Sequence, residues 1–142
     1  RMRRADAFGR ALGMSYQAYL AALSLNLYSA PPDQIDTDRL ATQLEPQFSP
    51  IPEMPDTHKQ TSFGHLDGYS AVYYTYAWSL VIARDLLSRF DRTNLLDPKA
   101  AKRYRDLVLA PGGSRPAKEL VRSFLGRDYD FAAFDAWLAG KN

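Results

Sequence analysis

Apolar side chains recur every three or four residues along most of this chain, which is the spacing of one face of an α-helix. Prolines and glycines separate the periodic stretches, and no stretch of useful length alternates apolar and polar residues as a half-buried strand would. The pattern therefore predicts an all-α fold, a helical bundle without internal repeats. The predicted helices span residues 5–28, 36–44, 69–90, 97–109, 114–125 and 131–139, and 69–90 is the longest periodic segment.

Several helix boundaries carry their own signals. Asp97 can cap the helix that begins at Pro98, because its carboxylate can accept a free backbone N–H and proline needs no such partner. Ser114 can cap the next helix, and Gly126 can end it. Four prolines in residues 46–55 predict an extended, non-helical segment between the second and third helices.

The chain has 142 residues and a formal net charge of +2, a composition typical of one soluble domain, so residues 1–142 are predicted to form a single helical region. A net charge so near zero gives no reason to expect nucleic acid or a membrane surface as a partner. No apolar run reaches the roughly 18 residues of a membrane span, and the absence of cysteine excludes disulfides. The basic start at Arg1, Arg3 and Arg4 lacks the apolar stretch of a secretory signal and is interpreted as solvated charge.

Tyrosines are concentrated at the start of the third predicted helix. Tyr69, Tyr73 and Tyr76 follow one another at intervals of four and three residues, which would align three phenols on one helix face. Tyr74 and Trp78 form a second pair on a neighbouring face. Phenol O–H groups beside a flexible loop can donate hydrogen bonds to a substrate or to a forming oxyanion. Core aromatics whose hydroxyls reach the surface are the alternative interpretation.

His65 lies directly after Gly64 and three residues before Gly68, in a predicted glycine-rich loop. Glycine lets a backbone approach a ligand closely, so a histidine here can present a ring N–H to it. A surface or capping histidine is the alternative. The second histidine, His58, lies seven positions earlier, without the spacing of a His-Glu-x-x-His zinc motif. The sequence therefore predicts no metal site within this chain.

The order of motifs resembles that of a known enzyme family. The chain is similar to the thimet oligopeptidase, neurolysin and oligopeptidase A family of zinc metallopeptidases over about residues 62–138, and more vaguely before them. The motifs that carry this resemblance are Ser62-Phe63-Gly64-His65-Leu66, Gly68-Tyr69, Tyr73-Tyr74-x-Tyr76-x-Trp78-Ser79, Arg89-Phe90, Leu95-Leu96-Asp97-Pro98, Arg103-Tyr104-Arg105, Leu109-Ala110-Pro111-Gly112-Gly113-Ser114 and Phe124-Leu125-Gly126-Arg127.

The resemblance implies a larger enzyme, a mostly helical clam-shell with a deep channel between its halves. In that family, two histidines of a His-Glu-x-x-His helix and a distal glutamate hold zinc, and the glutamate of the motif is the general base. This chain contains no His-Glu pair. The resemblance therefore implies the C-terminal part of such an enzyme, with zinc as a cofactor of the full-length parent alone. Its partners would be peptide substrates and the missing N-terminal region of the same enzyme.

The same resemblance suggests roles for the aromatic residues. His65 would correspond to the loop histidine that contacts the substrate backbone, and Tyr69 to the loop tyrosine. Tyr73 and Tyr76 would correspond to tyrosines that face the zinc. Tyr76 is the predicted donor to the tetrahedral oxyanion, with Tyr73 or Tyr69 assisting.

Three further positions have lesser predicted roles. Gly64 and Gly68 would give the loop its hinge freedom, and Tyr74 is grouped with them as a substrate-binding residue. Many relatives have an acidic residue where this chain has Leu80, so any polar contact made there by the family is not expected here.

These expectations concern a part of an enzyme, and the isolated chain is predicted to bind no zinc and to cleave nothing. The alternative hypothesis is a self-standing, non-catalytic helical module for peptide binding or self-association. Apolar faces that the rest of an enzyme would cover predict a symmetric dimer in solution. The predicted location is cytoplasmic.

Overall fold

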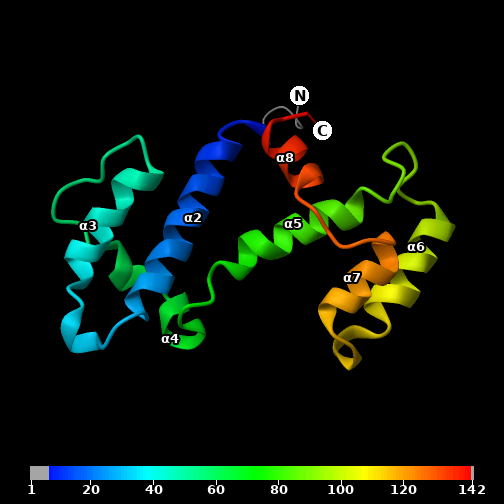
Figure 1. Ribbon diagram of the computed structural model, residues 1–142. Coiled ribbons are helices and arrows are strands. Elements are labelled where there is room, and N and C mark those ends of the chain that lie inside the picture. The colour runs from blue at the N-terminus through cyan, green and yellow to red at the C-terminus, as the bar shows by residue number, and fades with distance from the viewer. Residues whose placement is uncertain (1–6, 142) are drawn as a thin grey trace. The chain divides into compact units, whose positions relative to one another are not determined.

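The computed structural model describes residues 7–141 (Figure 1), and every regular element among them is helical, which confirms the all-α prediction. The basic start at Arg1, Arg3 and Arg4 lies outside the described residues, as do the first two residues of the first predicted helix. No helix in the described part is long and apolar enough to cross a membrane. The chain divides into two compact units, Arg1–Ala77 (unit 1) and Trp78–Asn142 (unit 2), which are described separately below.

The two longer helices of unit 1 lie side by side (Figure 1), α2 (Arg10–Leu27) and α3 (Thr37–Phe48). Asp36 caps α3, because its carboxylate accepts a hydrogen bond from the backbone N–H of Arg39 at 3.0 Å. The prediction that Pro46 lies in extended chain is wrong, since α3 continues through it. Pro46 has no N–H for the carbonyl of Thr42, so this turn lacks one helical hydrogen bond, and the Phe48 ring at the end of α3 packs 6.3 Å from that of Tyr19.

The core of unit 1 joins α2, α3 and the segment before α4. Its buried members are Tyr19 and Leu23 of α2, Ala41 of α3, and Phe63. Tyr19 and Leu23 follow the helical spacing of the sequence, whereas Leu12 and Tyr16, at the same spacing, are 54% and 47% exposed. Partly buried side chains packed around this core are those of Leu20, Leu27, Leu40, Leu44, Phe48, Leu66 and Tyr73.

The predicted helix over residues 69–90 is wrong in its extent. The structure has two helices there, α4 (His65–Tyr69) and α5 (Thr75–Leu87), separated by a break at Ser70 with φ 48°. The longest helix is therefore α2 with 18 residues, and α5 has 13. In place of a glycine-rich loop before it, the structure has a 3₁₀ turn at Lys59–Ser62 followed by α4.

Unit 2 contains the larger part of α5 and three further helices, α6 (Pro98–Tyr104), α7 (Ala117–Leu125) and α8 (Ala132–Leu138). A π-helical turn, Arg105–Leu109, continues α6. The predicted cap at Asp97 is confirmed, since its carboxylate accepts from the backbone N–H of Lys99 at 3.1 Å. Gly126 ends α7 with φ 78°, as predicted. Ser114 caps no helix; it ends a 3₁₀ turn, and Pro116 precedes α7.

The core of unit 2 consists of buried side chains of α7 and the rings packed on them. Val121, Phe124 and Leu125 are buried. The Phe124 ring lies 5.4 Å from that of Tyr104 and 5.9 Å from that of Phe90. These contacts join α7 to α6 and to the turn that follows α5, so α7 organises this unit.

Candidate functional site

The sequence-predicted site residues lie in and around α4, which begins at His65. Gly64 precedes it with φ −57°, and neither Gly64 nor Gly68 has a positive φ. A Cβ atom at either glycine would meet open space. The local backbone therefore does not require glycine at these two positions, and their role as hinges stays a prediction.

A strained residue ends α4 and sets the course of the chain beyond it. Ser70 has φ 48° and ψ −125°, which is unfavourable for a residue with a Cβ atom. Its carbonyl oxygen accepts a hydrogen bond of 2.6 Å from the hydroxyl of Ser24, a fully buried residue of α2. This bond fixes the break, with Tyr69 before it and Tyr73 after it.

The break gathers aromatic rings around His65. The His65 ring lies 5.0 Å from that of Tyr73 and 5.7 Å from that of Tyr76, and both pairs are edge to face. Its distances to the rings of Tyr69 and Phe63 are 6.1 Å and 5.8 Å. The structure thus brings together the predicted residues His65, Tyr69, Tyr73 and Tyr76. They meet because the helix is interrupted at Ser70, and they do not lie along one helix face.

Two polar contacts orient the rings. The Tyr76 hydroxyl lies 3.2 Å from Nε2 of His65, and either group can be the donor, depending on the histidine tautomer. The Tyr73 hydroxyl donates to Oε1 of Gln17 on α2 at 3.0 Å. Tyr73 is therefore held by unit 1's interior, whereas Tyr76 is held by His65.

The phenols of the site differ in exposure. Tyr69 and Tyr76 are 64% and 55% exposed, and Tyr73 is half-buried. Burial raises the pKa of the Tyr73 phenol above its ordinary value, with smaller contributions from Tyr76 and Tyr16, against the opposing hydrogen bond to Gln17. Tyr73 therefore stays a neutral hydrogen-bond donor at neutral pH. Exposed phenol and imidazole groups in one cluster can bind a carbonyl or an oxyanion.

Tyr74 and His58 lie apart from this cluster. Tyr74 is 50% exposed, and within the described residues no ring contact joins it to His65. His58 pairs instead with Asp38 of α3, Nδ1 to Oδ1 at 2.7 Å. In residues 7–141 there is no group of three or more His, Asp or Glu side chains that could hold a metal ion. The described residues therefore do not fit a zinc site.

Sequence reasoning missed the residues that support the cluster. Gln17 and Ser24 contact partners 56 and 46 positions further along the chain. No local spacing signals such contacts. Phe63 lies in a quoted motif, but its place in the core, with its ring 5.0 Å from that of Tyr73, was not predicted. The sequence did offer one sign of this role, an aromatic residue two positions before a predicted site histidine.

Comparisons with known proteins agree with the resemblance seen in the motifs. A thimet-like oligopeptidase of Dictyostelium discoideum is 32% identical over 120 residues, which are 83% of this chain and 18% of that protein. A mitochondrial intermediate peptidase of Coprinopsis cinerea is 33% identical over 125 residues, 86% of this chain and 16% of that protein. A probable cytosolic oligopeptidase A of Arabidopsis thaliana is 37% identical over 84 residues, 55% and 12% respectively.

The chain thus spans less than a fifth of the length of these curated relatives. The model of one family, described as peptidase family M3, matches residues 1–139 and so nearly the whole chain. That match includes the His65 cluster and both units. The chain therefore belongs to peptidase family M3.

Proposed function

We propose that this chain is the C-terminal part of a zinc-dependent oligopeptidase that hydrolyses short peptides. In that enzyme it supplies the substrate-binding segment and the oxyanion-stabilising tyrosines. The observation that carries the proposal is the 3.2 Å contact between the Tyr76 hydroxyl and His65, inside the family match and among three further rings. The short share of the relatives that the chain spans supports a part of a larger enzyme.

The proposed chemistry divides between the rings of the cluster. The Tyr76 hydroxyl donates to the oxygen of the scissile carbonyl as it becomes an oxyanion, and Tyr73 or Tyr69 assists. His65 holds the Tyr76 hydroxyl in place and contacts the substrate backbone through its ring. Tyr74, Gly64 and Gly68 line the path of the peptide, the glycines with hinge freedom.

Zinc enters this proposal as a cofactor of the full-length parent. The metal, when bound, polarises the carbonyl and activates a water molecule. Because the described residues contain no fitting group of metal ligands, the proposal assigns the ligands to the N-terminal region of the same enzyme. This chain alone is then inactive, and its partners are that region and the peptide substrate.

The proposal extends to location and assembly. We place the parent enzyme in the cytoplasm, as the name of the relative from Arabidopsis thaliana says of that protein, although another relative is named mitochondrial. The isolated chain forms a symmetric dimer, because large apolar side chains of unit 1 are exposed, including Phe8 at 91% and Leu12 at 54%.

The proposal is tested by measuring zinc content and the hydrolysis of a quenched fluorescent peptide. Both measurements are made on the 142-residue chain and on the full-length parent. We expect neither zinc nor turnover from the 142-residue chain, with circular dichroism confirming its helices. We expect stoichiometric zinc and turnover from the full-length parent. Zinc and turnover in the 142-residue chain would contradict the proposal that the zinc ligands lie in the N-terminal region of the parent enzyme. Peptide binding without hydrolysis by the parent would favour the non-catalytic module instead.

A further inference from the structure

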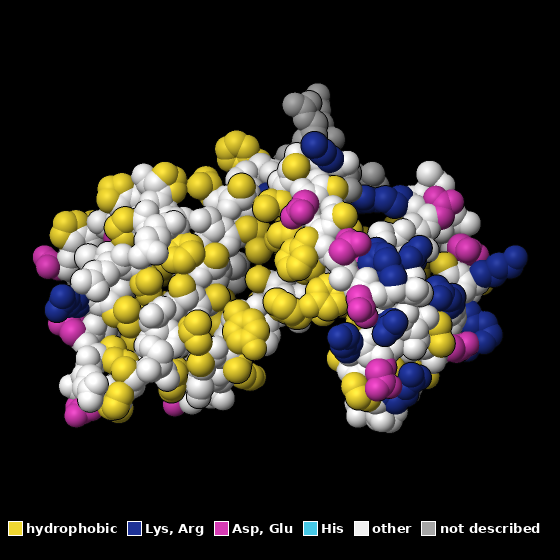
Figure 2. Space-filling view, in the orientation of Figure 1, with side chains coloured by type: hydrophobic (Ala, Val, Ile, Leu, Met, Phe, Trp, Pro, Cys, Tyr) yellow, Lys and Arg dark blue, Asp and Glu magenta, His cyan; other side chains and the backbone are white. Residues whose placement is uncertain are grey.

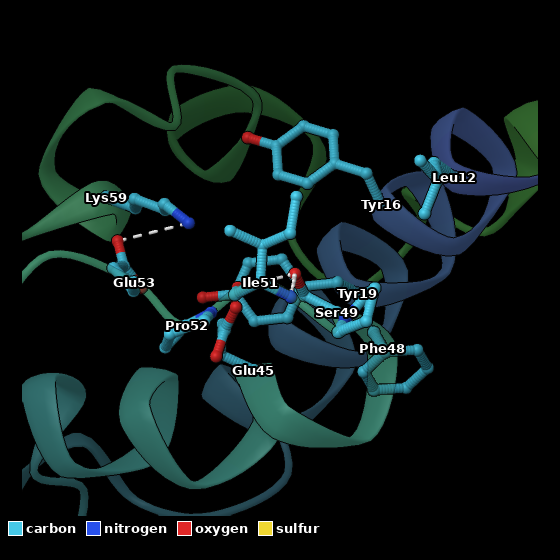
Figure 3. A pocket seen from close by; sticks show the side chains of 11 residues that line it. Leu12, Tyr16, Tyr19, Glu45, Phe48, Ser49, Ile51, Pro52, Glu53 and Lys59 are labelled. Carbon is cyan, nitrogen blue, oxygen red and sulfur yellow. Dashed lines mark hydrogen bonds and ion pairs between the residues drawn. The ribbon is translucent and has the colours of Figure 1, made fainter. Parts of the chain in front are cut away.

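A cavity of about 270 Å³ lies within unit 1, apart from the residues of the His65 cluster (Figure 3). Its wall comes from four segments: α2, the end of α3, the proline-rich chain that follows, and the 3₁₀ turn that begins at Lys59. Residues that line it include Leu12, Tyr19, Glu45, Phe48, Ile51 and Glu53. Most of this wall is apolar, so the polar groups in it decide what can bind.

One polar group in the wall is a phenol without a partner. Tyr19 is 2% exposed, and its hydroxyl is buried with no hydrogen-bond partner among the described residues. Burial raises the pKa of this phenol to about 12, and the charges of Glu53 and Glu45 add to the effect. Tyr19 therefore stays protonated in a negative environment. A buried hydroxyl in that state gains from a ligand that completes its hydrogen bonds.

The second polar group is a carboxylate. Glu45 is 7% exposed, and within residues 7–141 no hydrogen bond or ion pair reaches its side chain. The other carboxylate of the cavity, on Glu53, is paired with the Lys59 ammonium at 3.1 Å. Two carboxylates and one ammonium leave one negative charge unbalanced. A carboxylate without a counterion at the edge of an apolar cavity attracts positive charge, so the cavity favours a cation.

The ring of Tyr19 already accommodates a cation. The Lys59 ammonium lies 5.7 Å from its centroid, within the range of a cation–π contact. Figure 3 shows Tyr19 and Glu45 close together in the wall, with Ile51 and Phe48 beside them. A cationic head and an apolar body would therefore both find complementary surface there.

We propose that this cavity binds a small organic amine, a primary ammonium group on an apolar body the size of one aromatic ring. The ammonium donates to the Glu45 carboxylate, and it reaches the phenol oxygen of Tyr19 when the side chains that cover that oxygen move aside. The apolar body packs against Leu12, Phe48 and Ile51. This site is independent of the proposed peptidase function, since it uses none of the residues of the His65 cluster.

Titration of the 142-residue chain with benzylamine, and in parallel with its neutral isostere benzyl alcohol, tests the proposal by NMR. We expect benzylamine to shift amide resonances of α2, α3 and residues 49–53, and to bind at least about tenfold more tightly than the alcohol. Equal affinity for both compounds would overturn the proposal, as would shifts confined to other segments. This comparison needs no substitution, so it does not depend on the folding of a variant.

Two variants then assign the contacts. Glu45→Gln should lower benzylamine affinity about tenfold and remove the preference over the alcohol, and Tyr19→Phe should lower it several-fold. Glu119→Gln and Tyr104→Phe are matched controls in unit 2, where neither residue lines the cavity. Unchanged affinity in folded Glu45→Gln protein would exclude the ion pair on which the proposal depends.

Discussion

The two units of this chain differ in the pairing of one buried polar side chain each, Asp85 in unit 2 and Tyr19 in unit 1. In unit 2, the buried carboxylate of Asp85 is fully engaged: Arg127 donates to both of its oxygens at 2.6 and 2.7 Å, and the backbone N–H of Asp130 donates at 2.9 Å. In unit 1, the Tyr19 hydroxyl has no partner in the described residues, and the exposed Tyr76 hydroxyl has His65 alone. Satisfied groups stabilise a fold, and unsatisfied ones are available to ligands.

The surfaces of the units differ in the same sense. Figure 2 shows hydrophobic side chains gathered over the helices of unit 1, whereas Lys, Arg, Asp and Glu side chains gather over α6 and α7 of unit 2. Phe8 and Tyr69 of unit 1 are 91% and 64% exposed. On the face shown, unit 1 therefore offers the larger apolar surface for a binding partner.

Substitution of Tyr76 gives the largest expected effect, and it should be confined to function. In the full-length parent, Tyr76→Phe should lower kcat about 10²- to 10³-fold, or about 3–4 kcal/mol, because an oxyanion donor is lost. Its ring is 55% exposed, so the unfolding midpoint should change little. Steady-state kinetics and thermal unfolding measure both quantities. Tyr104→Phe in unit 2 is the control, and a Tyr76→Phe enzyme with unchanged kcat would refute the assigned role.

Substitution of Asp85 should lower the stability of the fold, in contrast to substitution of Tyr76, which should lower kcat. Asp85→Asn keeps the volume but breaks the pair with Arg127, and it should lower the free energy of unfolding by about 2–3 kcal/mol. The value lies below that of a fully buried pair because the Arg127 side chain is 38% exposed and can be hydrated. Hydrogen exchange should quicken in α7 and not in α2. Asp135→Asn, at an exposed position, is the control; equal exchange in both units would contradict the comparison.

Acid should weaken unit 2 through the same carboxylate. Burial raises the pKa of Asp85, but the hydrogen bonds from Arg127, Asp130 and Ser88 outweigh it, so the folded-state pKa lies below its ordinary value. The stabilisation is present above the unfolded value of about 3.9 and is lost as the pH falls through the folded value. Denaturant unfolding followed between pH 6 and 2 should show this loss in the wild-type protein. Asp85→Asn should make the free energy of unfolding depend less on pH. An unchanged dependence would show that other carboxyl groups cause the loss in acid.

The sequence predicted many local features of the fold, but it missed the helix break at Ser70, the course of α3 through Pro46 and the start of α7 beyond Ser114. Helical spacing, the cap at Asp97 and the stop at Gly126 depend on neighbouring residues, and all were confirmed. The break at Ser70 was missed because the tyrosine spacing continues across it as if the helix did. What stabilises that break is the hydroxyl of Ser24, 46 positions earlier, which no local pattern reveals.

The candidate site shows the same division between local and distant signals. The family motifs pointed to His65 and Tyr76, and the structure joins them by a direct contact. The expected geometry, three phenols on one helix face, was wrong because Tyr69 ends α4 and Tyr76 lies in α5. Gln17 comes from α2 and became visible only when tertiary contacts were known.

Removal of the Gln17 side-chain amide should have a modest effect. It separates the contribution of Tyr73 to stability from its contribution to catalysis. Gln17→Leu leaves the half-buried Tyr73 hydroxyl without its acceptor and should lower the free energy of unfolding by about 1 kcal/mol. Denaturant unfolding measures this loss, with Gln43→Leu on the exposed face of α3 as the control. In the parent enzyme, the predicted kcat loss should be smaller than for Tyr76→Phe. A larger loss would make Tyr73 the principal donor.

The smallest expected effect is a pH dependence of unit 1 with the opposite sign to that of unit 2. The hydrogen bond and charge of Asp38 raise the pKa of His58. The contribution of this pair is therefore fully present below about pH 6.5 as long as Asp38 stays ionised, and it is lost as the pH rises through the folded value of His58. Hydrogen exchange near the start of α3, corrected for the intrinsic effect of pH, should show a shallow loss of protection that His58→Gln abolishes and Asp85→Asn does not. Because acid weakens unit 2 and mild alkali weakens unit 1, the two variants together test whether the units respond separately.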